Sequence, residues 1–360
     1  MFRRVLILGD GTAGAENQAK ALWKRLGSQI NGGSERQINK LTTTSPEIVR
    51  ILPKNKLYKS IPPAVHIFLW KCLCKIPMLS SFNNILWFGY NYEVIEAILY
   101  NHENGYPDLV IGCGRLTAPI NTFIRFNSKS TTFNIQIQHP RVSPKYFNRI
   151  ITPKHDLTGN KWFRPEIARN VDTIPGSLHG IDMEWVTQGK KKWDDLNCVK
   201  NNEKNNNNQD QIFCSTVIIG GQHKNCIYDE NDVKKMISTF ITNYVPNGHE
   251  TILYIICSRR TSENILKMLD SIQFEYKKNV SIRIWRNSEL DGIDNPYQMA
   301  LSMSSKIIVT GDSISMMTEC MAINQLKNNS GMKSDLYIAF KDKVKGKHLR
   351  FLVENKKSFS

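Results

Sequence analysis

The sequence lacks the features that mark several large classes of protein. No stretch of about 18 uncharged apolar residues occurs, so we expect no membrane-spanning helix. Zinc-finger spacing, an aromatic RNA-binding signature and a basic coiled-coil arm are also absent, and we therefore expect no nucleic-acid partner. The first apolar run, Val5 to Gly9, is too short for a secretory signal and precedes no small-residue cleavage site, so it predicts a first strand.

Closely spaced cysteines are also scarce. Of the eight cysteines, only Cys72 and Cys74 lie close together, and no second pair completes a set of metal ligands. Several of the others lie in apolar, strand-like runs, where free cysteine acts as a small hydrophobic residue. We therefore expect a reducing, cytoplasmic setting, with no structural disulfide and no bound metal.

Positive charge is what the chain has in excess. Its 360 residues carry a formal net charge of +16, which suits nucleic acid, an anionic membrane surface or a phosphorylated substrate. Lysine and arginine are spread along the chain rather than gathered in one arm, which disfavours nucleic acid. The charge therefore indicates a phosphorylated ligand or a peripheral position on an anionic membrane.

Apolar runs alternate with helix-length amphipathic stretches along almost the whole sequence. This alternation is typical of parallel sheets covered by helices. We predict an α/β fold with two Rossmann-like domains facing a cleft, in which ligands lie at the carboxyl ends of the strands. The predicted strands are residues 5–8, 108–112, 132–138 and 147–152 in the first half, and 213–219, 251–257, 280–285, 307–309 and 335–340 in the second.

A polar tract from Asn197 to Gln211 separates the two halves. It contains a run of asparagines that cannot bury a core, so it predicts a solvent-exposed insertion. The predicted plan has an N-terminal domain over residues 1–178, a linker with the insertion over 179–211, a C-terminal domain over 212–345 and a basic tail over 346–360.

The most apolar segment runs from Val65 to Leu79 and is interrupted by Pro77. Its composition favours a buried helix. The alternative is a helix lying in a membrane surface, with Trp70 and neighbouring lysines at the boundary between lipid and water.

One strand-to-helix turn carries the strongest sign of a ligand. The strand of residues 307–309 breaks before Asp312, and a helical pattern begins at Ser313. Such a turn directs backbone N–H groups and the positive end of the helix dipole at one spot, which suits a phosphate. Glu319 follows near the same end of the helix, where its carboxylate could accept hydrogen bonds from ribose hydroxyls. The alternative is an ordinary N-cap, in which Asp312 or Ser313 satisfies the first helical N–H groups.

Other turns of the second half also carry polar donors. Two arginines and two hydroxyls in residues 258–261 suit a diphosphate, although a solvated helix start would also explain them. Residues 295–297 offer amide and ring contacts to a base or a sugar. The nucleotide-binding candidates are therefore Gly220, Gly221, Ser258, Arg259, Arg260, Thr261, Asn295, Tyr297, Asp312, Ser313, Ser315 and Glu319.

The first half contains a glycine-rich turn at residues 9–14, directly after the first strand. Its glycines permit positive φ and close approach of a ligand. Their spacing formally matches a dinucleotide fingerprint, but no acidic residue ends a second strand about 20 residues later, which argues against NAD. Asp10 is placed to take a proton from a hydroxyl. The other candidates on this side, which turn geometry or structural histidines would also explain, are Gly11, Thr12, Gly14, Arg115, His139, Arg141 and His155.

These segments together resemble a known family. The motifs G-D-G-T-A-G-A-E-N-Q, P-D-L-V-I-G-C-G-R, Q-H-P-R, P-K-H-D, I-G-G, S-R-R-T, N-P-Y and T-G-D-S-I-S-M-M-T-E occur in that order. The set is similar to the mitochondrial fission family named for elongated mitochondria, over roughly residues 3 to 340. The resemblance implies a GT-B-like fold, with a nucleotide sugar in the C-terminal domain and an acceptor in the N-terminal one. It also implies a plant relative that brings a dynamin-related GTPase to the mitochondrial outer surface.

Two functions follow from this resemblance. In the first, the chain transfers a sugar without metal or cofactor, the nucleotide sugar being a substrate and the acceptor lipid-linked on an anionic membrane. Gly220, Gly221, Arg260, Ser313 and Ser315 would then hold the diphosphate, Asn295 and Glu319 the nucleoside, and Asp10 would be the general base. In the second, the chain is a non-catalytic adaptor at a membrane surface, which would be the mitochondrial outer surface in a eukaryote. An NAD-dependent enzyme is a third, weaker alternative.

Overall fold

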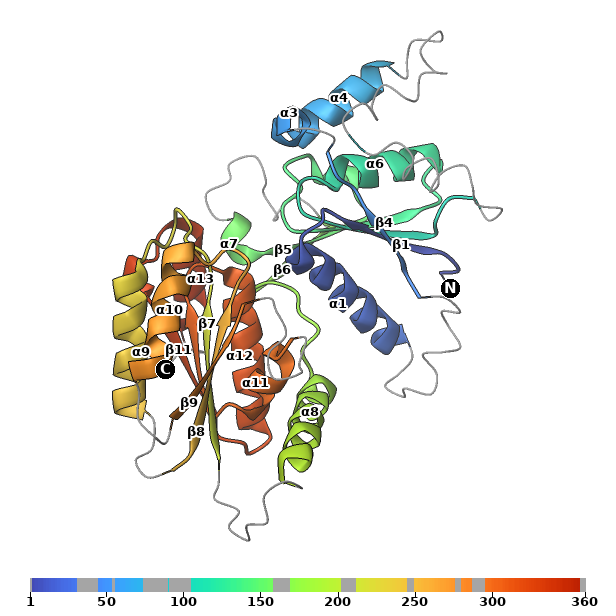
Figure 1. Cartoon of the computed structure of the whole chain (residues 1–360). Coiled ribbons are helices and arrows are strands. Elements are labelled where there is room, and N and C mark those ends of the chain that lie inside the picture. The colour runs from blue at the N-terminus through green and yellow to red at the C-terminus, as the bar shows by residue number, and fades with distance from the viewer. Residues whose placement is uncertain are drawn as a thin grey trace. The chain divides into compact units, whose positions relative to one another are not determined.

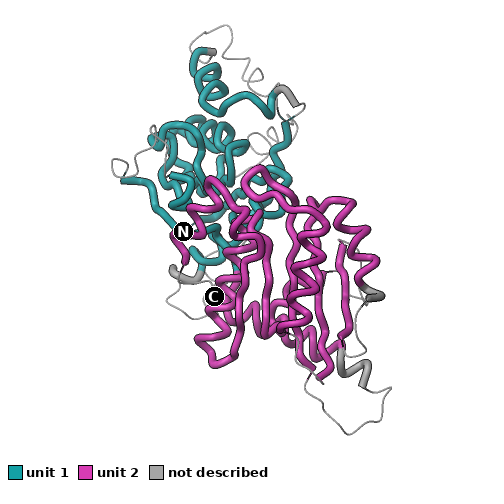
Figure 2. Tube along the Cα trace, turned by 90° about the vertical axis from the view of Figure 1, so that its left-hand side faces the viewer, with its two compact units in different colours: residues 1–180 teal, residues 181–360 magenta. Residues whose placement is uncertain are grey.

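A computed structural model describes residues 2–30, 45–53, 56–73, 90, 105–157, 169–201, 212–244, 249–275, 280–286 and 295–356 (Figure 1). The chain divides into two compact units, Met1–Gly180 and Ile181–Ser360 (Figure 2). Each unit is an α/β structure built on one parallel sheet, as predicted. The predicted cleft stays a prediction, and each unit is described by itself.

The sheet of unit 1 has six parallel strands in the order β2-β1-β3-β4-β5-β6. The strands are β1 (Val5–Gly9), β2 (Glu47–Arg50), β3 (Leu109–Cys113), β4 (Phe133–Ile137), β5 (Arg149–Pro153) and β6 (Val171–Ile174). The α-helices of this unit are α1 (Ala13–Ile30), α3 (Lys56–Ser60), α4 (Pro63–Leu73), α6 (Ala118–Asn127) and α7 (Lys154–Leu157).

The central strands of unit 1 are buried on both faces, which explains their almost continuous apolar sequences. In β1, Leu6 and Leu8 belong to a core shared with α4 and α6. Val5 and Ile7 point to the other face, where they pack against α1. The sheet is thus the middle layer between α1 and the helices α4 and α6 (Figure 1).

The sheet of unit 2 has five parallel strands in the order β11-β10-β7-β8-β9. They are β7 (Phe213–Ile219), β8 (Thr251–Cys257), β9 (Val280–Trp285), β10 (Lys306–Thr310) and β11 (Asp335–Ala339). The α-helices are α8 (Met183–Asn201), α9 (Glu230–Tyr244), α10 (Glu263–Glu275), α11 (Tyr297–Met303), α12 (Ile314–Asn329) and α13 (Gly346–Glu354).

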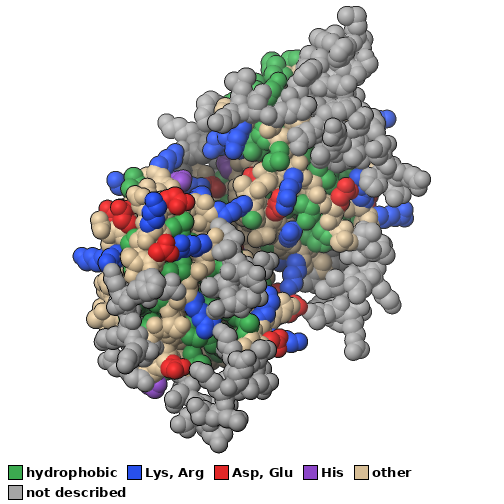
Figure 3. Space-filling view, in the orientation of Figure 1, with side chains coloured by type: hydrophobic (Ala, Val, Ile, Leu, Met, Phe, Trp, Pro, Cys, Tyr) green, Lys and Arg blue, Asp and Glu red, His purple; other side chains and the backbone are tan. Residues whose placement is uncertain are grey.

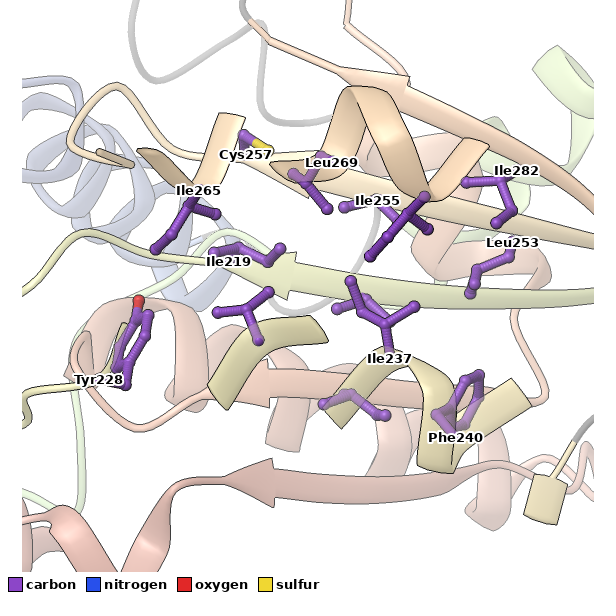
Figure 4. Packing of buried hydrophobic residues seen from close by; sticks show 14 of the residues in the cluster. Ile219, Tyr228, Ile237, Phe240, Leu253, Ile255, Cys257, Ile265, Leu269 and Ile282 are labelled. Carbon is purple, nitrogen blue, oxygen red and sulfur yellow. The ribbon is translucent and has the colours of Figure 1, made fainter. Parts of the chain in front are cut away.

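Helices cover both faces of this second sheet. On one face, α9 and α10 pack on β7 and β8 through residues such as Ile237 and Leu269 (Figure 4). On the other face, α8, α11, α12 and α13 contribute to two further apolar clusters, in which Phe351 of α13 is fully buried. The last three residues of β7 alternate between the faces in the same way as those of β1.

The structure assigns more of the chain to the C-terminal unit than the sequence predicts. Residues 183–201, predicted as part of a linker, form α8, which packs so closely on α11 that a Cβ on Gly189 would lie 2.2 Å from Ser302 Oγ. Residues 346–354, predicted as part of a basic tail, form α13 and bury Phe351. In both segments a few apolar side chains, such as Trp193 and Phe351, are buried among many charged residues, so the overall composition does not reveal that these helices pack on the unit. The asparagine-rich part of the insertion, residues 202–211, lies outside the described residues.

Helix α4 covers the first part of the apolar segment predicted at Val65 to Leu79, and residues 74–79 lie outside the described residues. Ile67 and Trp70 are buried, whereas 65% of Phe68 is exposed. The helix is therefore buried on one side only. Among the described residues, none of the helices combines the length and the apolar composition that a membrane span requires.

Charge is distributed rather than concentrated on the visible surface. On the face shown in Figure 3, lysine and arginine side chains are scattered and interspersed with acidic ones. This pattern agrees with the even spread of basic residues along the sequence.

Both sheets contain a topological switch point. In unit 2 the chain runs from β7 to β8 on one side and returns through β10 on the other, so helices leave the carboxyl ends of β7 and β10 toward opposite faces. In unit 1 the same change of direction falls between β1 and β3. Open α/β sheets bind ligands in the crevice at such a point.

Candidate functional site

The site of unit 2 is built from the loops that follow β7, β8 and β10 at the switch point. Gly220 and Gly221 directly follow β7, and each accommodates one neighbouring loop. A Cβ on Gly220 would lie 2.0 Å from Asp312 Oδ2, and a Cβ on Gly221 would lie 2.2 Å from Arg260 Cβ. Both positions therefore require glycine for packing between loops. The predicted role of this pair in holding a diphosphate stays a prediction.

The carboxylate of Asp312 lies inside this junction. Its Oδ1 accepts hydrogen bonds from Thr310 Oγ1 (2.5 Å) and Tyr228 Oη (3.1 Å), and Thr310 Oγ1 accepts one from the Gly220 amide (2.8 Å). Burial raises the pKa of Asp312, while those two hydrogen bonds and the charge of Arg260 act in the opposite direction. Asp312 thus ties the β10 and β7 loops together from behind the surface of the site.

Two other candidates in the β8 loop, Ser258 and Thr261, form hydrogen bonds within and next to this loop. Thr261 Oγ1 donates to the carbonyls of Ile219 (3.1 Å) and Gly220 (3.0 Å), and Ser258 Oγ accepts a hydrogen bond from the Arg260 amide (3.1 Å). Their hydroxyls stabilise the loop. The side chain of Arg260 is 56% exposed, and its Nη2 lies 3.9 Å from Asp312 Oδ2. Arg259, its neighbour, is exposed.

The N-terminus of α12 meets these loops without a side-chain cap. Ser313 is the N-cap residue, with extended backbone, and its hydroxyl makes no capping hydrogen bond. The carboxylate of Asp312 is engaged with Thr310 and Tyr228 instead. The ordinary capping explanation of this turn is therefore wrong for both side chains. Ser313 and Ser315 are half-buried at the positive end of a 16-residue helix, an arrangement that suits an anion.

A second polar pair lies farther along α12. Tyr297 Oη donates to Glu319 Oε2 at 2.6 Å, which links the start of α11 to the second turn of α12. Burial raises the pKa of Glu319, and the hydrogen bond from Tyr297 opposes this shift. Asn295 Oδ1 accepts a hydrogen bond from the Tyr297 amide (2.9 Å), so Asn295 helps to begin α11.

The sequence did not single out His223, which lies in the loop after β7. Its Nδ1 accepts a hydrogen bond from the Asn225 amide (3.2 Å), so the neutral ring carries its proton on Nε2. Burial lowers the pKa of His223, and the charges of Lys347, Arg260 and Lys224 lower it further, against the effect of Asp312. His223 therefore lies within electrostatic range of the candidate site. The sequence feature that could have identified His223 is its position three residues after Gly220, in the same loop.

The candidates of unit 1 follow the strands β1, β3, β4 and β5, and Asp10 lies at the switch point between β1 and β3. Asp10 is half-buried after β1, and its Oδ1 accepts hydrogen bonds from the Thr12 amide (2.9 Å) and hydroxyl (2.5 Å). Its Oδ2 is directed toward Gly114, where a Cβ would lie 3.7 Å away. Gly11 has positive φ (79°), whereas no atom lies within 4 Å of a Cβ on Gly14. Only part of this glycine pattern is therefore required by the backbone.

Arg115 and the two histidines of unit 1 have different surroundings. Arg115 Nη2 donates to the Lys59 carbonyl (3.2 Å), which gives this cation a structural partner. His155 is buried, with Nε2 4.0 Å from Asp156 Oδ1, so it is shielded from solvent. His139 and Arg141 lie in one turn with an unusual backbone.

In that turn Gln138 and Arg141 both have positive φ, of 67° and 59°. The Arg141 amide donates to His139 Nδ1 at 3.0 Å, and burial lowers the pKa of His139. The neutral ring therefore carries its proton on Nε2 and is suited to donate a hydrogen bond rather than to act as a base. Left-handed backbone at non-glycine residues costs free energy and is concentrated at functional sites.

Sequence comparison places this arrangement in a family. The family model described as Mitochondrial fission ELM1 matches residues 13–325. The chain is 25% identical over 347 residues to the mitochondrial fission protein ELM1 of Arabidopsis thaliana, which covers 89% of this chain and 76% of that protein. It is also 25% identical over 227 residues to an uncharacterized protein of Rickettsia prowazekii, covering 59% and 61% of the two chains.

Similar solved structures are more distant. A UDP-GlcNAc 2-epimerase from Neisseria meningitidis, bound to UDP-GlcNAc, has a TM-score of 0.46 at 11% identity, covering 98% of this chain and 85% of that one. The N-terminal domain of Candida albicans trehalose-6-phosphate phosphatase has a TM-score of 0.46 at 11% identity, covering 94% and 84%. At such values these likenesses assign neither an activity nor a ligand.

Proposed function

Because the chain belongs to the family described as Mitochondrial fission ELM1, we propose that it retains a GT-B-like site for a nucleotide diphosphate sugar in its C-terminal unit. One observation carries the proposal: α12 begins without a side-chain cap at the switch point, beside the exposed guanidinium of Arg260. The helix start and Arg260 supply backbone and bidentate donors for a diphosphate.

The nucleoside would lie along α12 beyond the diphosphate. Glu319 is half-buried, and Tyr297 occupies only one of its carboxylate oxygens in the contacts described above. The Glu319 carboxylate would accept hydrogen bonds from ribose hydroxyls, as the sequence predicts. The hydroxyls of Ser258 and Thr261 would hold the β8 loop, and Arg260, Ser313 and Ser315 would contact the ligand.

Sugar transfer is the reaction that this site would support. An acceptor oxygen would bond to the anomeric carbon while the bond from that carbon to the β-phosphate oxygen breaks, and the diphosphate would leave with the electron pair. Asp10 would take the acceptor proton, since its Oδ2 is directed toward the loop after β3 and its Oδ1 is held by Thr12. Positioned donors at α12 would stabilise the charge of the leaving diphosphate.

The experiment is thermal unfolding in the presence of UDP, GDP, CMP and their sugars. A ligand at 100 times its Kd should add about 2.7 kcal/mol of stability. Arg260→Gln should abolish the shift, and Arg149→Gln, which alters an exposed arginine of unit 1, should preserve it. No shift with any nucleotide would refute the proposal.

A second experiment tests the candidate base. Asp10→Asn should keep the thermal shift with the nucleotide sugar and lose sugar transfer, so unchanged transfer would remove Asp10 from the mechanism.

A second function, an adaptor at a membrane surface, is favoured by one feature of unit 1. Helix α4 exposes 65% of Phe68 and 47% of Leu69, an apolar pair that would suit the interface of a peripheral protein. On this proposal the partner would be a dynamin-related GTPase at an organelle surface. Phe68→Ser should then weaken binding to anionic vesicles and leave the nucleotide shift unchanged. Vesicle binding that Phe68→Ser leaves unchanged would contradict the adaptor function.

A further inference from the structure

The two glycines after β7 allow the carboxylate of Asp312 and the guanidinium of Arg260 to approach each other. Gly220 makes room for the carboxylate of Asp312, and Gly221 makes room for the backbone and Cβ of Arg260. The two admitted side chains meet at 3.9 Å, between Arg260 Nη2 and Asp312 Oδ2. Because Asp312 directly precedes Ser313, the N-cap residue of α12, the pair lies next to the candidate anion site.

Asp312 and Arg260 differ in solvent exposure. The Asp312 side chain has no exposed surface, whereas 56% of the Arg260 side chain is exposed. Both hydrogen bonds to the carboxylate reach Oδ1, and Oδ2 accepts none from any described residue. Arg260 is thus the only cation that compensates Oδ2 among the described residues, and it is the partner that can turn toward a ligand.

Other titratable groups face Asp312 from the neighbouring loops. Burial raises the pKa of Tyr228, and it raises that of Cys226 to about 12, so both stay protonated near neutral pH. His223 has a lowered pKa and is neutral there. Of these described groups around Asp312, only Asp312 itself and His223 can therefore change protonation when an anion arrives.

We propose that an anion bound at the start of α12 draws Arg260 away from Asp312, and that Asp312 then takes up one proton from solvent. Asp312 is on this view a positioning residue that holds Arg260 in place until the ligand arrives. Burial already raises the pKa of its carboxyl, and both the loss of Arg260 and the added negative charge raise it further. The proposal rests on the proposed diphosphate site.

The linkage has a definite sign. Because the bound state holds one more proton than the unbound state, anion affinity falls as pH rises between the two values of the Asp312 pKa. The steepest slope is about tenfold per pH unit for one proton. Below this range Asp312 is protonated in both states, and the slope disappears.

Titration calorimetry in buffers of different ionisation enthalpy measures the protons taken up on binding. UDP-GlcNAc and sulfate are suitable probes because neither changes its own protonation near neutral pH. Net uptake of up to one proton is expected for the full chain with either probe. Asp312→Asn should abolish it, whereas His223→Asn and the exposed control Asp335→Asn should preserve it. Uptake lost in His223→Asn and kept in Asp312→Asn, or no uptake in the unaltered chain, would overturn the proposal.

The two probes separate this inference from the proposed function. Binding of sulfate with uptake at Asp312, but no binding of any nucleotide sugar, would refute only the nucleotide-sugar function. If neither probe binds, both proposals fail. Should Asp312→Asn not fold, Arg260→Gln gives an independent readout, because Asp312 should then show the infrared C=O band of a protonated acid before any anion is added. Absence of that band at pH values where the unaltered chain takes up its proton would overturn the proposal.

Discussion

Gly220 and Gly14 show how differently single glycines are constrained in this chain. Gly220 faces a buried carboxylate, and a Cβ there would overlap Asp312 Oδ2 at 2.0 Å. Gly14 lies exposed in the first turn of α1, with nothing within 4 Å of a Cβ. Both glycines belong to motifs that the sequence singles out. Gly220 is required for packing, whereas the space around Gly14 would also admit a larger side chain.

This contrast gives opposite expectations for alanine. Gly220→Ala should destabilise the chain by about 1–3 kcal/mol, because Asp312 must shift out of its hydrogen bonds with Thr310 and Tyr228. Gly14→Ala should stabilise it by about 0.5–1 kcal/mol, because alanine favours a helix. Denaturant unfolding of both variants is the measurement. Equal effects would contradict the steric account.

At the scale of elements, α13 determines how the C-terminal unit is closed. The helix follows β11 and places Phe351 in the core shared by α8, α11 and α12. Its opposite side is exposed, with 67% of Val353 accessible. The helix is therefore part of the folded unit, which a count of its basic residues does not reveal.

Truncation of the two side chains separates these faces of α13. Phe351→Ala should cost about 3–5 kcal/mol, because it empties a fully buried site. Val353→Ala, two residues away on the exposed side, should change stability by less than about 0.5 kcal/mol. Chemical denaturation compares them directly. A small effect of Phe351→Ala would mean that α13 does not belong to the folded core.

The sequence predicts elements well where burial is complete. The continuous apolar runs of β7 and β8 mark central strands, and the structure places both in the middle of a sheet. Strands β2 and β6 were not predicted, because they are short edge strands with mostly exposed or half-buried side chains. Edge strands pack on one neighbour only, so little in their composition distinguishes them from loops.

For the candidate site, too, the sequence predicts only part of what the structure shows. Spacing predicted the loops that meet at the switch point, and it identified Arg260 and Ser313, which remain accessible. It also assigned ligand contacts to Asp312 and Thr261, which face the protein interior. A sequence shows which loop a side chain belongs to, whereas the side of the loop that it faces depends on packing with distant segments.

At the scale of the whole molecule, the chain consists of two units with separate sheets and cores. Each unit is larger than the minimum size that a domain needs to fold independently around one hydrophobic core. The candidate nucleotide residues belong to unit 2, and the candidate base Asp10 belongs to unit 1. Ligand binding and the proposed proton transfer therefore depend on different cores.

Calorimetry of the full chain should resolve two unfolding transitions. A nucleotide sugar should raise the midpoint of one transition, because a ligand stabilises only the unit that binds it. Phe351→Ala should lower the midpoint of the same transition and leave the other unchanged. If one transition responds to the ligand and the other to Phe351→Ala, the ligand site cannot lie in unit 2.

The central position of β7 has a consequence for how the chain is made. Strand β7 pairs with β8 soon after both are synthesised, but its other edge waits for β10, as the pairing of Ser215 with Lys306 shows. Pairing across so long a stretch of chain is slow, and an open strand edge can recruit the wrong partner. A chain that stalls before Lys306 should therefore aggregate more readily than one that is complete. On this reasoning, β10 can cover the open edge of β7, and the turn before α12 can take its place beside Gly220, only after Lys306 has been synthesised.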